Sequence, residues 1–204
     1  SSWEVKMDGK AQLGSRDRML EAAISLMRGS GLTGAGINEI VRVSGAPKGS
    51  VYHFFPQGKA QIASEALTVY SKRVMAVMEQ ALASERQEGA KVSALFRAFA
   101  RRVEEGDFRQ SCAVGTVTLD LDADLQQLQT ILGDAFSQWA ALIGEHLDLG
   151  DAVRTRSFAG LILTSIEGAY VRCRAERSSR AFTEAGEWLA ILADQQKLKA
   201  MRPA

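Results

Sequence analysis

The chain has 204 residues, of which 46% are hydrophobic and 24% are charged, and its formal net charge is only +1. This length and balance are those of an ordinary folded protein with one domain or two small ones, and the net charge alone indicates no nucleic-acid partner. Two cysteines without a CxxC pair exclude a disulfide framework, and no apolar stretch approaches the ~18–20 residues that span a bilayer. Without a recognisable secretory leader, we expect a reduced, cytoplasmic protein with no membrane partner.

Helices are predicted almost throughout, because only three prolines occur and good helix formers fill long stretches. After a tail over residues 1–14, Ser15 is placed to cap a first helix, and Asp17 adds negative charge to its first turn. The apolar residues of this helix recur with helical spacing: Met19, Ala22, Ala23, Leu26 and Met27. Gly29 and Gly31 are predicted to end it.

A second, shorter helix follows, with apolar residues at the same spacing: Ile37, Ile40 and Val41. It is predicted to stop at Ser44, and Gly45 suits the left-handed position just past a helix end. Pro47 then suits the first turn of a third helix, where the missing N–H is no loss.

This third helix separates two faces on a helical wheel. The apolar stripe consists of Pro47, Val51, Phe54 and Phe55, and the opposite side carries Lys48, Gly49, Ser50, Tyr52 and His53. Three short helices with a glycine-containing turn between the last two are typical of a helix-turn-helix, whose second helix lies in the DNA major groove. A solvated amphipathic helix with a chance cluster of polar residues is the alternative at this point.

Each residue of that polar face has a chemical use on DNA. Lys48 is able to meet phosphate or guanine, and Ser50, Tyr52 and His53 are able to meet phosphates or base edges. Gly49 lets the backbone approach closely. Residues 1–60 contain 8 Lys and Arg against 5 Asp and Glu, whereas residues 61–204 contain 17 against 19. This mild asymmetry favours an anionic partner for the first part of the chain.

Residues 15–67 resemble the DNA-binding domain of the TetR family of bacterial transcriptional regulators. The motifs "MLEAAISLMRGSGL" and "INEIVRVSGAPKGSVYHFFPQGKAQIASEAL" follow the order of that family, and "APKGSVYHFFPQGK" is similar to its LmrA/YxaF-type subgroup. The resemblance implies that Tyr52, His53 and Lys59 contact phosphates and that Lys48 and Ser50 lie at the groove. It covers about a quarter of the chain.

The chain departs from the family pattern where a Thr or Ser usually caps the second helix and holds a phosphate. Ala35 stands in that position here, and Thr33 lies two residues earlier. Two interpretations follow: a less effective cap that costs roughly 1 kcal/mol, or a shifted turn in which Thr33 serves as the DNA contact.

The rest of the chain continues the helical pattern and shows no competing strand pattern. Apolar residues keep helical phase from Gly58 to about Ser84, which predicts a rod of about 40 Å suited to act as a lever. Further helices are predicted at about 90–105, 112–121, 123–147, 152–176 and 181–197. We therefore expect an all-α protein with a helix-turn-helix domain over residues 15–60 and a helical ligand-binding and dimerisation domain over residues 61–204.

A ligand pocket is expected between the middle helices, for an unidentified small-molecule inducer. Its candidate wall is apolar and partly aromatic: Phe96, Phe99, Val103, Phe108, Val117, Leu121, Phe136, Trp139 and Ile143. Thr164 or Ser165 would orient the ligand. Such a lining favours a flat or greasy molecule over an anion, although plain core packing explains the same pattern.

The last two long helices have residues suited to helix-on-helix packing. Gly160, Thr164 and Gly168 recur every four residues on one, and the other carries Phe182, Ala185, Trp188, Leu189 and Leu192. The resemblance implies that this pair forms a four-helix bundle with its copy in a homodimer. A two-fold protein also suits a two-fold operator in double-stranded DNA, although completion of the monomer core is the alternative.

Two other functions are alternatives to a ligand-responsive DNA-binding regulator. Cys112 opens a predicted helix near Arg109, an environment that lowers a thiol pKa, so a thiol- or electrophile-responsive regulator is an alternative. An enzyme is a remote one. His53 and His146 have no catalytic partner at a recognisable spacing, and the chain contains no HExxH, Walker or GxGxxG motif. We expect no catalytic residues, no cofactor and no metal.

Overall fold

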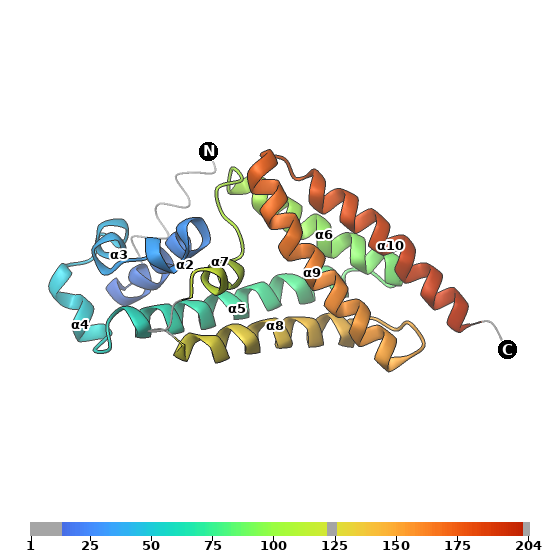
Figure 1. Ribbon diagram of the computed structural model, residues 1–204, viewed down its shortest axis with the longest axis horizontal. Helices are drawn as coiled ribbons and strands as arrows, with labels where there is room; N and C mark the ends of the chain where they lie inside the picture. Colours follow the sequence, from blue (N-terminus) through green and yellow to red (C-terminus); the bar gives the residue numbers. More distant parts are fainter. Residues whose placement is uncertain (1–13, 122–125, 202–204) are drawn as a thin grey trace. The chain divides into compact units, whose positions relative to one another are not determined.

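Figure 1 shows the computed structural model of the protein, which describes residues 14–121 and 126–201. Within these ranges the chain forms helices and no strand, which confirms the predicted all-α fold. In chain order the elements are α2 (Ser15–Gly34), α3 (Ile37–Ser44), the 3-10 turn η1 (Lys48–Ser50), α4 (Val51–Phe54), α5 (Lys59–Ala83), α6 (Glu88–Glu105), α7 (Ala113–Leu119), α8 (Gln127–His146), α9 (Ala152–Glu176) and α10 (Arg180–Ala200). Most of the predicted tail and the predicted start of a helix at residue 123 lie outside the described residues.

Glycines set the helix ends in the N-terminal part largely as predicted. Gly31 interrupts α2 with φ +68° and ψ −166°, and a short helical stretch then continues to Gly34. Gly45 has φ +63° and its N–H donates to the Val41 carbonyl, which confirms the left-handed position after α3. The predicted cap at Ser15 is wrong, because Gly14 occupies the cap position and the Ser15 hydroxyl instead accepts a hydrogen bond from Arg18.

The described residues divide into two compact units, each considered by itself. Unit 1 contains residues up to Tyr70 together with Ala113–Leu132, and unit 2 contains Ser71–Cys112 together with Gly133–Ala204. The helices α5 and α8 contribute residues to both units. The predicted domain boundary after residue 60 stays a prediction. That predicted boundary does not anticipate that α7 belongs to unit 1, the unit that contains the helix-turn-helix, although it lies far along the chain.

Unit 1 packs α2 against α3 and α7 around a small apolar core. Met19 and Met27 of α2 are fully buried, and Val51 and Phe55 are fully buried as well, at 0% exposure each. The hydroxyl of Thr116 on α7 donates to the Met27 carbonyl at 2.7 Å, which ties α7 to α2 by a polar contact as well as by packing.

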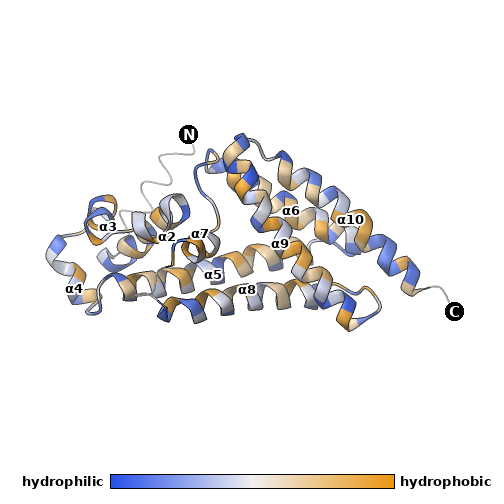
Figure 2. Ribbon diagram, in the orientation of Figure 1, coloured by the Kyte–Doolittle hydropathy of each residue, from blue (hydrophilic) through white to orange (hydrophobic). Residues whose placement is uncertain are grey.

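Unit 2 packs α6, α9 and α10 around an aromatic cluster. The Phe99 ring stacks on Phe182 with ring centroids 6.2 Å apart, and the Tyr170 ring meets Phe182 edge-on at 5.2 Å. A Cβ on Gly186 would lie 2.7 Å from the Cβ of Phe96, so α6 and α10 cross closely only because this residue is glycine. Figure 2 shows hydrophobic and hydrophilic residues interspersed along these helices, as expected for amphipathic elements. Among the described residues, none of the helices has both the length and the apolar character to cross a bilayer.

Candidate functional site

The predicted reading helix is a 3-10 turn followed by a single turn of α-helix (Figure 1). Val51 and Phe55 anchor it, since both are fully buried, and the Arg16 guanidinium lies 5.3 Å from the centre of the Phe55 ring. The predicted apolar stripe needs correction at Pro47, which is exposed and precedes the helical turns with ψ +132°. The wheel assumed a regular helix from residue 47, and the extended backbone at that residue breaks the assumption.

The opposite face of this element is open to solvent, as predicted. Lys48, Gly49, Tyr52 and His53 are all exposed, and Tyr52 leaves 63% of its surface uncovered. The Lys48 side chain makes no hydrogen bond or ion pair with any residue in the described ranges, whereas its backbone carbonyl accepts from the Val51 N–H. A Cβ on Gly49 would meet nothing within 4 Å, so a partner surface is able to approach the backbone there.

The other predicted contacts differ in how available they are. The Ser50 hydroxyl donates to the Pro47 carbonyl at 2.6 Å, which leaves only its lone pairs for a partner. Lys59 begins α5 and is partly exposed. The Tyr52 ring lies beside Gly58, 3.6 Å from a Cβ built there, so the φ of +64° at Gly58 shapes the turn that brings Tyr52 and Lys59 into one neighbourhood.

Thr33 has an intramolecular partner that sequence reasoning missed. Its hydroxyl donates to Asp120 Oδ1 at 2.9 Å, and its backbone N–H donates to Asp120 Oδ2. Hydrogen bonds from the Thr33 backbone, with further contributions from its hydroxyl, the Leu32 backbone and the nearby Lys59 charge, lower the pKa of Asp120. The Thr33 donors, which one of the two interpretations assigns to a DNA phosphate, are therefore already bound to a carboxylate 87 residues away in the sequence.

Comparison with known proteins identifies the architecture around this element. YxaF of Bacillus subtilis is 30% identical over 156 residues, which span 76% of this chain and 82% of the relative. Residues 89–188 match the family model of the LmrA/YxaF-like transcriptional regulator C-terminal domain. This chain belongs to the TetR family of transcriptional regulators.

Solved structures of TetR-family regulators share the fold at low sequence identity. A TetR regulatory protein from Rhodobacter sphaeroides superposes with a TM-score of 0.78 at 18% identity, covering 87% of this chain and 97% of that one. A cysteine variant of CifR, complexed with 26-base-pair double-strand operator DNA, has a TM-score of 0.75 at 17% identity, covering 86% of this chain and 94% of that one. Since the relatives are TetR-family transcriptional regulators, the remote enzyme alternative is set aside.

In this TetR-family chain, none of the eleven predicted ligand residues lines either of the two cavities described in unit 2. Phe96, Phe99, Val103, Trp139 and Ile143 are buried to 2% exposure or less in unit 2, while Val117 and Leu121 belong to unit 1. The remaining predicted residues are partly buried or exposed: Phe108, Phe136, Thr164 and Ser165. Two cavities in unit 2, of about 390 and 610 Å³, are lined by other residues.

The hydroxyls predicted to orient a ligand bond to their own helix. Thr164 donates to the Gly160 carbonyl and Ser165 to the Leu161 carbonyl, each one turn earlier in α9. The Phe136 ring meets Trp139 edge-on, and the Trp139 indole N–H donates to the Ser71 carbonyl at 3.3 Å, which satisfies it within the protein. These residues form core and helix contacts, and their role towards a ligand stays a prediction.

The predicted dimer residues fall into two groups. Thr164, Gly168, Trp188 and Leu192 are exposed, and Gly160 and Ala185 are partly so. Phe182 is fully buried and Leu189 is 6% exposed, so both pack inside their own protomer. Their assignment to an interface with a copy is corrected, because amphipathic spacing does not distinguish a side facing the protomer core from a side facing a partner.

The environment of Cys112 also differs from the expectation. The thiol is 2% exposed and precedes the first residue of α7. Arg109, expected to lower the thiol pKa, is exposed and donates from Nε to Asp107 at 3.0 Å. A hydrogen bond instead joins Cys112 to Glu167, whose pKa is raised by burial to about 7. The thiol-responsive alternative therefore lacks the accessible, cation-flanked cysteine on which it was based.

Proposed function

We propose that this TetR-family regulator is a homodimeric repressor that binds a palindromic operator through η1 and α4 and is released by a small molecule. The single observation that carries the proposal is the exposed face of Lys48, Gly49, Tyr52 and His53, held from behind by buried Val51. An unpaired ammonium, a phenol and an imidazole around a bare backbone position match the chemistry of phosphates and base edges. The structure of CifR with operator DNA supports this use of the shared fold.

Homodimerisation is supported by apolar residues that remain uncovered on α9 and α10. Trp188 is 69% exposed and Leu161 is 47% exposed, and these helices expose further hydrophobic side chains: Val153, Val171, Ile191, Leu192 and Leu198. A Cβ on Gly160 or Gly168 would meet nothing within 4 Å, so the backbone of α9 is open to close approach by another helix. An exposed tryptophan on such a surface is the residue type most enriched at interface centres.

Release by a small molecule requires that the ligand bind one conformation of the dimer better than the DNA-bound conformation. The helix α5 connects the two functions along the chain, because Lys59 begins it and its second half belongs to unit 2. A ligand that changes the tilt of α5 would change the separation of the two α4 elements, which must match half-sites about 34–36 Å apart.

The test is a titration of labelled DNA from upstream of the gene with the purified protein. We expect specific binding whose affinity falls by roughly 10³ between 50 and 200 mM salt, as for about six phosphate contacts. The double substitution Lys48→Glu and Tyr52→Ala should weaken binding at least about tenfold. Lys72→Glu, at an exposed lysine of unit 2, is the matched charge control and should leave affinity within about twofold.

Two outcomes would contradict the proposal. Binding that is insensitive to salt would exclude the phosphate contacts, and an unchanged operator affinity in a folded Lys48→Glu, Tyr52→Ala protein would exclude α4 as the reading element. Folding of the variant is checked by its helical circular dichroism and its unfolding temperature.

A further inference from the structure

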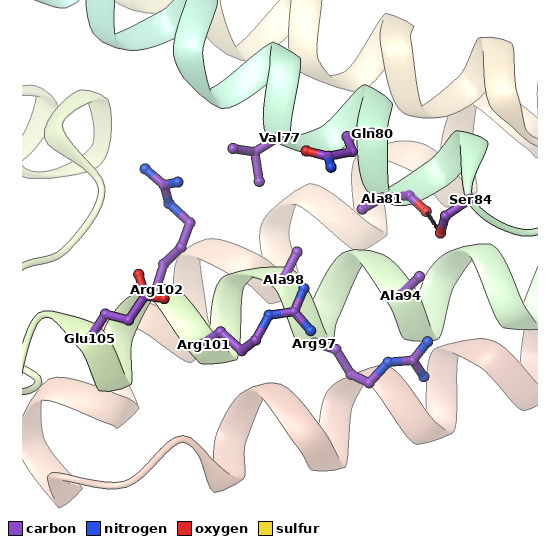
Figure 3. Close-up of a pocket in the computed structure, with 10 residues that line it drawn as sticks. All are labelled: Val77, Gln80, Ala81, Ser84, Ala94, Arg97, Ala98, Arg101, Arg102 and Glu105. Atoms are coloured by element: carbon purple, nitrogen blue, oxygen red, sulfur yellow. Dashed lines mark hydrogen bonds between the residues drawn. The ribbon is translucent and has the colours of Figure 1, made fainter. Parts of the chain in front are cut away.

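Unit 2 contains a cavity of about 390 Å³ between α5 and α6, which sequence analysis did not anticipate (Figure 3). Its apolar wall is made of small side chains, including Ala81 from α5 and Ala94 and Ala98 from α6. Small residues at facing positions of two packed helices leave a hollow where larger ones would fill it. The volume lies within the range of small-molecule sites.

The remaining wall is basic. Arg97, Arg101 and Arg102 all line the cavity, and Glu105 is its single acidic residue. In Figure 3 the Arg102 side chain extends from α6 in the direction of α5. Guanidinium groups keep their charge at any physiological pH, so the wall carries a net positive charge.

The three arginines differ in whether the protein neutralises them. Arg97 Nη2 lies 3.7 Å from a carboxylate oxygen of Glu85, a long and exposed ion pair. Arg101 and Arg102 make no side-chain hydrogen bond or ion pair with any residue of the described ranges, although Arg102 is only partly exposed. Arg97 and Arg101 are four residues apart on α6 and therefore project from the same side of the helix, with Glu105 a further turn along.

We propose that this cavity binds a small organic anion, a molecule with an apolar body and a carboxylate or phosphate group. The anionic group is held by Arg101 and Arg102, whose forked N–H donors match the geometry of carboxylate and phosphate oxygens. The apolar body lies against Ala98 and Val77, and the Gln80 side chain on α5 supplies a further polar contact. This ligand class is opposite in charge preference to the uncharged aromatic pocket expected from the sequence.

The proposal rests on the proposed function in one respect, since it makes this anion the effector of the regulator. The ligand would touch α5 at Val77 and Gln80, and the same helix begins with Lys59 in unit 1. Binding at the cavity is nonetheless a property of unit 2 and is measurable without DNA.

The experiment uses three probes of similar shape in calorimetric titrations of the full chain: 2-naphthoate, 2-naphthyl phosphate and the neutral 2-naphthamide. We expect at least one anion to bind about tenfold or more tightly than the amide, since a charge-assisted pair with arginine contributes on that scale. The stronger of the two anions identifies carboxylate or phosphate as the preferred group. Equal binding of the amide, or no binding of either anion at millimolar concentration, overturns the proposal.

Variants then locate the site. Arg101→Gln together with Arg102→Gln should weaken the anion at least about tenfold, and the single change Arg101→Gln, at an exposed position, should weaken it severalfold without affecting folding. The pair Arg154→Gln and Arg156→Gln removes the same charge from exposed residues of α9 that do not line this cavity, and should bind as the parent does. If Arg101→Gln and the folded double variant both bind the anion as tightly as the parent does, the anion does not bind at this cavity.

Operator titrations with the same proteins separate this inference from the proposed function. If both arginine variants bind operator DNA normally and a neutral compound releases it, the repressor stands and the anion site is wrong. If the anion binds at Arg101 but no palindromic DNA is bound, the site stands and the repressor is wrong.

Discussion

The element around α4 and the helix pair α9 and α10 are both amphipathic, but their exposed sides differ in chemistry. On η1 and α4, Val51 and the adjoining Phe55 are buried, and the exposed side carries a lysine, a tyrosine and a histidine. On α9 and α10 the buried side is also apolar, but the exposed side carries Trp188 and Leu161 as well. Both buried faces are apolar, so they indicate only that each element packs against a hydrophobic core.

The difference lies in what each exposed face still requires. A polar, basic face is stable in water and gains from an anion with hydrogen-bonding atoms. An exposed apolar face gains from burial against another protein surface. The exposed chemistry is the reason for proposing a nucleic-acid partner for η1 and α4 and a second copy for α9 and α10. The substitutions below test this proposed division from the largest expected effect to the smallest.

The largest effect is expected from removing the anchor behind α4. Phe55→Ala deletes a fully buried ring that also lies under the Arg16 guanidinium, and should lower the free energy of unfolding by about 3–5 kcal/mol. Chemical denaturation monitored by circular dichroism measures this loss. Tyr52→Ala, on the exposed side of the same turn, is the control and should leave stability within about 0.5 kcal/mol.

A second prediction concerns Glu167, a carboxyl that α9 carries inward, beside Cys112. Burial raises its pKa to about 7 from an ordinary value of 4.5, so the folded protein keeps a proton that the unfolded chain releases between those values. The contribution of Glu167 to the free energy of unfolding is therefore most favourable at low pH, and it falls as the pH rises through about 7. The loss amounts to about 3 kcal/mol over the whole window.

Glu167→Gln is uncharged at every pH and should not show this loss. The variant should gain stability relative to the parent between pH 5 and pH 8, by about 2–3 kcal/mol in denaturation experiments at the two values. Glu187→Gln, at an exposed position of α10, is the matched control and should show no such gain. A parent and a Glu167→Gln protein with parallel pH profiles would contradict a raised pKa.

The apolar face is tested at its most exposed large residue. Trp188→Asp should raise the dimer dissociation constant about 30-fold or more, as for an interface residue that contributes 2 kcal/mol, with little change in helical content. Sedimentation equilibrium measures the dissociation constant. Thr183→Asp adds the same charge on an exposed position of α10 about 140° around the helix, and dimerisation should survive it. Equal dissociation constants for the two variants would remove this face from the dimer.

The sequence was most informative where local chemistry decides the backbone. The left-handed Gly45, the break at Gly31 and the polar side of the reading helix were predicted because each depends on one residue type or on a spacing of a few residues. Pro47 was misplaced for a related reason, since its fixed φ suits both a helical first turn and the extended conformation that it adopts.

Features that join distant parts of the chain were not predictable in this way. The cavity between α5 and α6 forms because Ala81 of α5 faces Ala94 and Ala98 of α6. Helical periodicity predicts only that all three alanines are core residues. Periodicity likewise did not reveal that Phe182 faces its own protomer, and nothing in the spacing joined Thr33 to Asp120. The sequence does contain several arginines on α6 and an acidic residue, Asp120, directly after α7, but their roles depend on how the helices pack.

The smallest effect is expected at the contact between Thr33 and Asp120, which holds the turn before α3 within unit 1. Asp120→Ala removes both hydrogen bonds and should lower the free energy of unfolding by about 1 kcal/mol at pH 7, a value discounted because the contact is exposed to solvent. Asp134→Ala, at an exposed carboxylate of α8, is the control and should be neutral.

The pH dependence of this last effect has the opposite sign to that of Glu167. The pKa of Asp120 is lowered in the folded protein, chiefly by the Thr33 backbone, so its stabilising contribution is complete above the ordinary value of 3.8 and is lost as the pH falls through the lowered one. The difference in free energy of unfolding between the parent and Asp120→Ala should therefore shrink under acidic conditions. The corresponding difference between the parent and Glu167→Gln is also smallest there. A difference that persists unchanged in acid would mean that the Asp120 carboxylate packs against Gly31 rather than binding through its charge, because a Cβ on Gly31 would lie only 2.8 Å from an Asp120 oxygen.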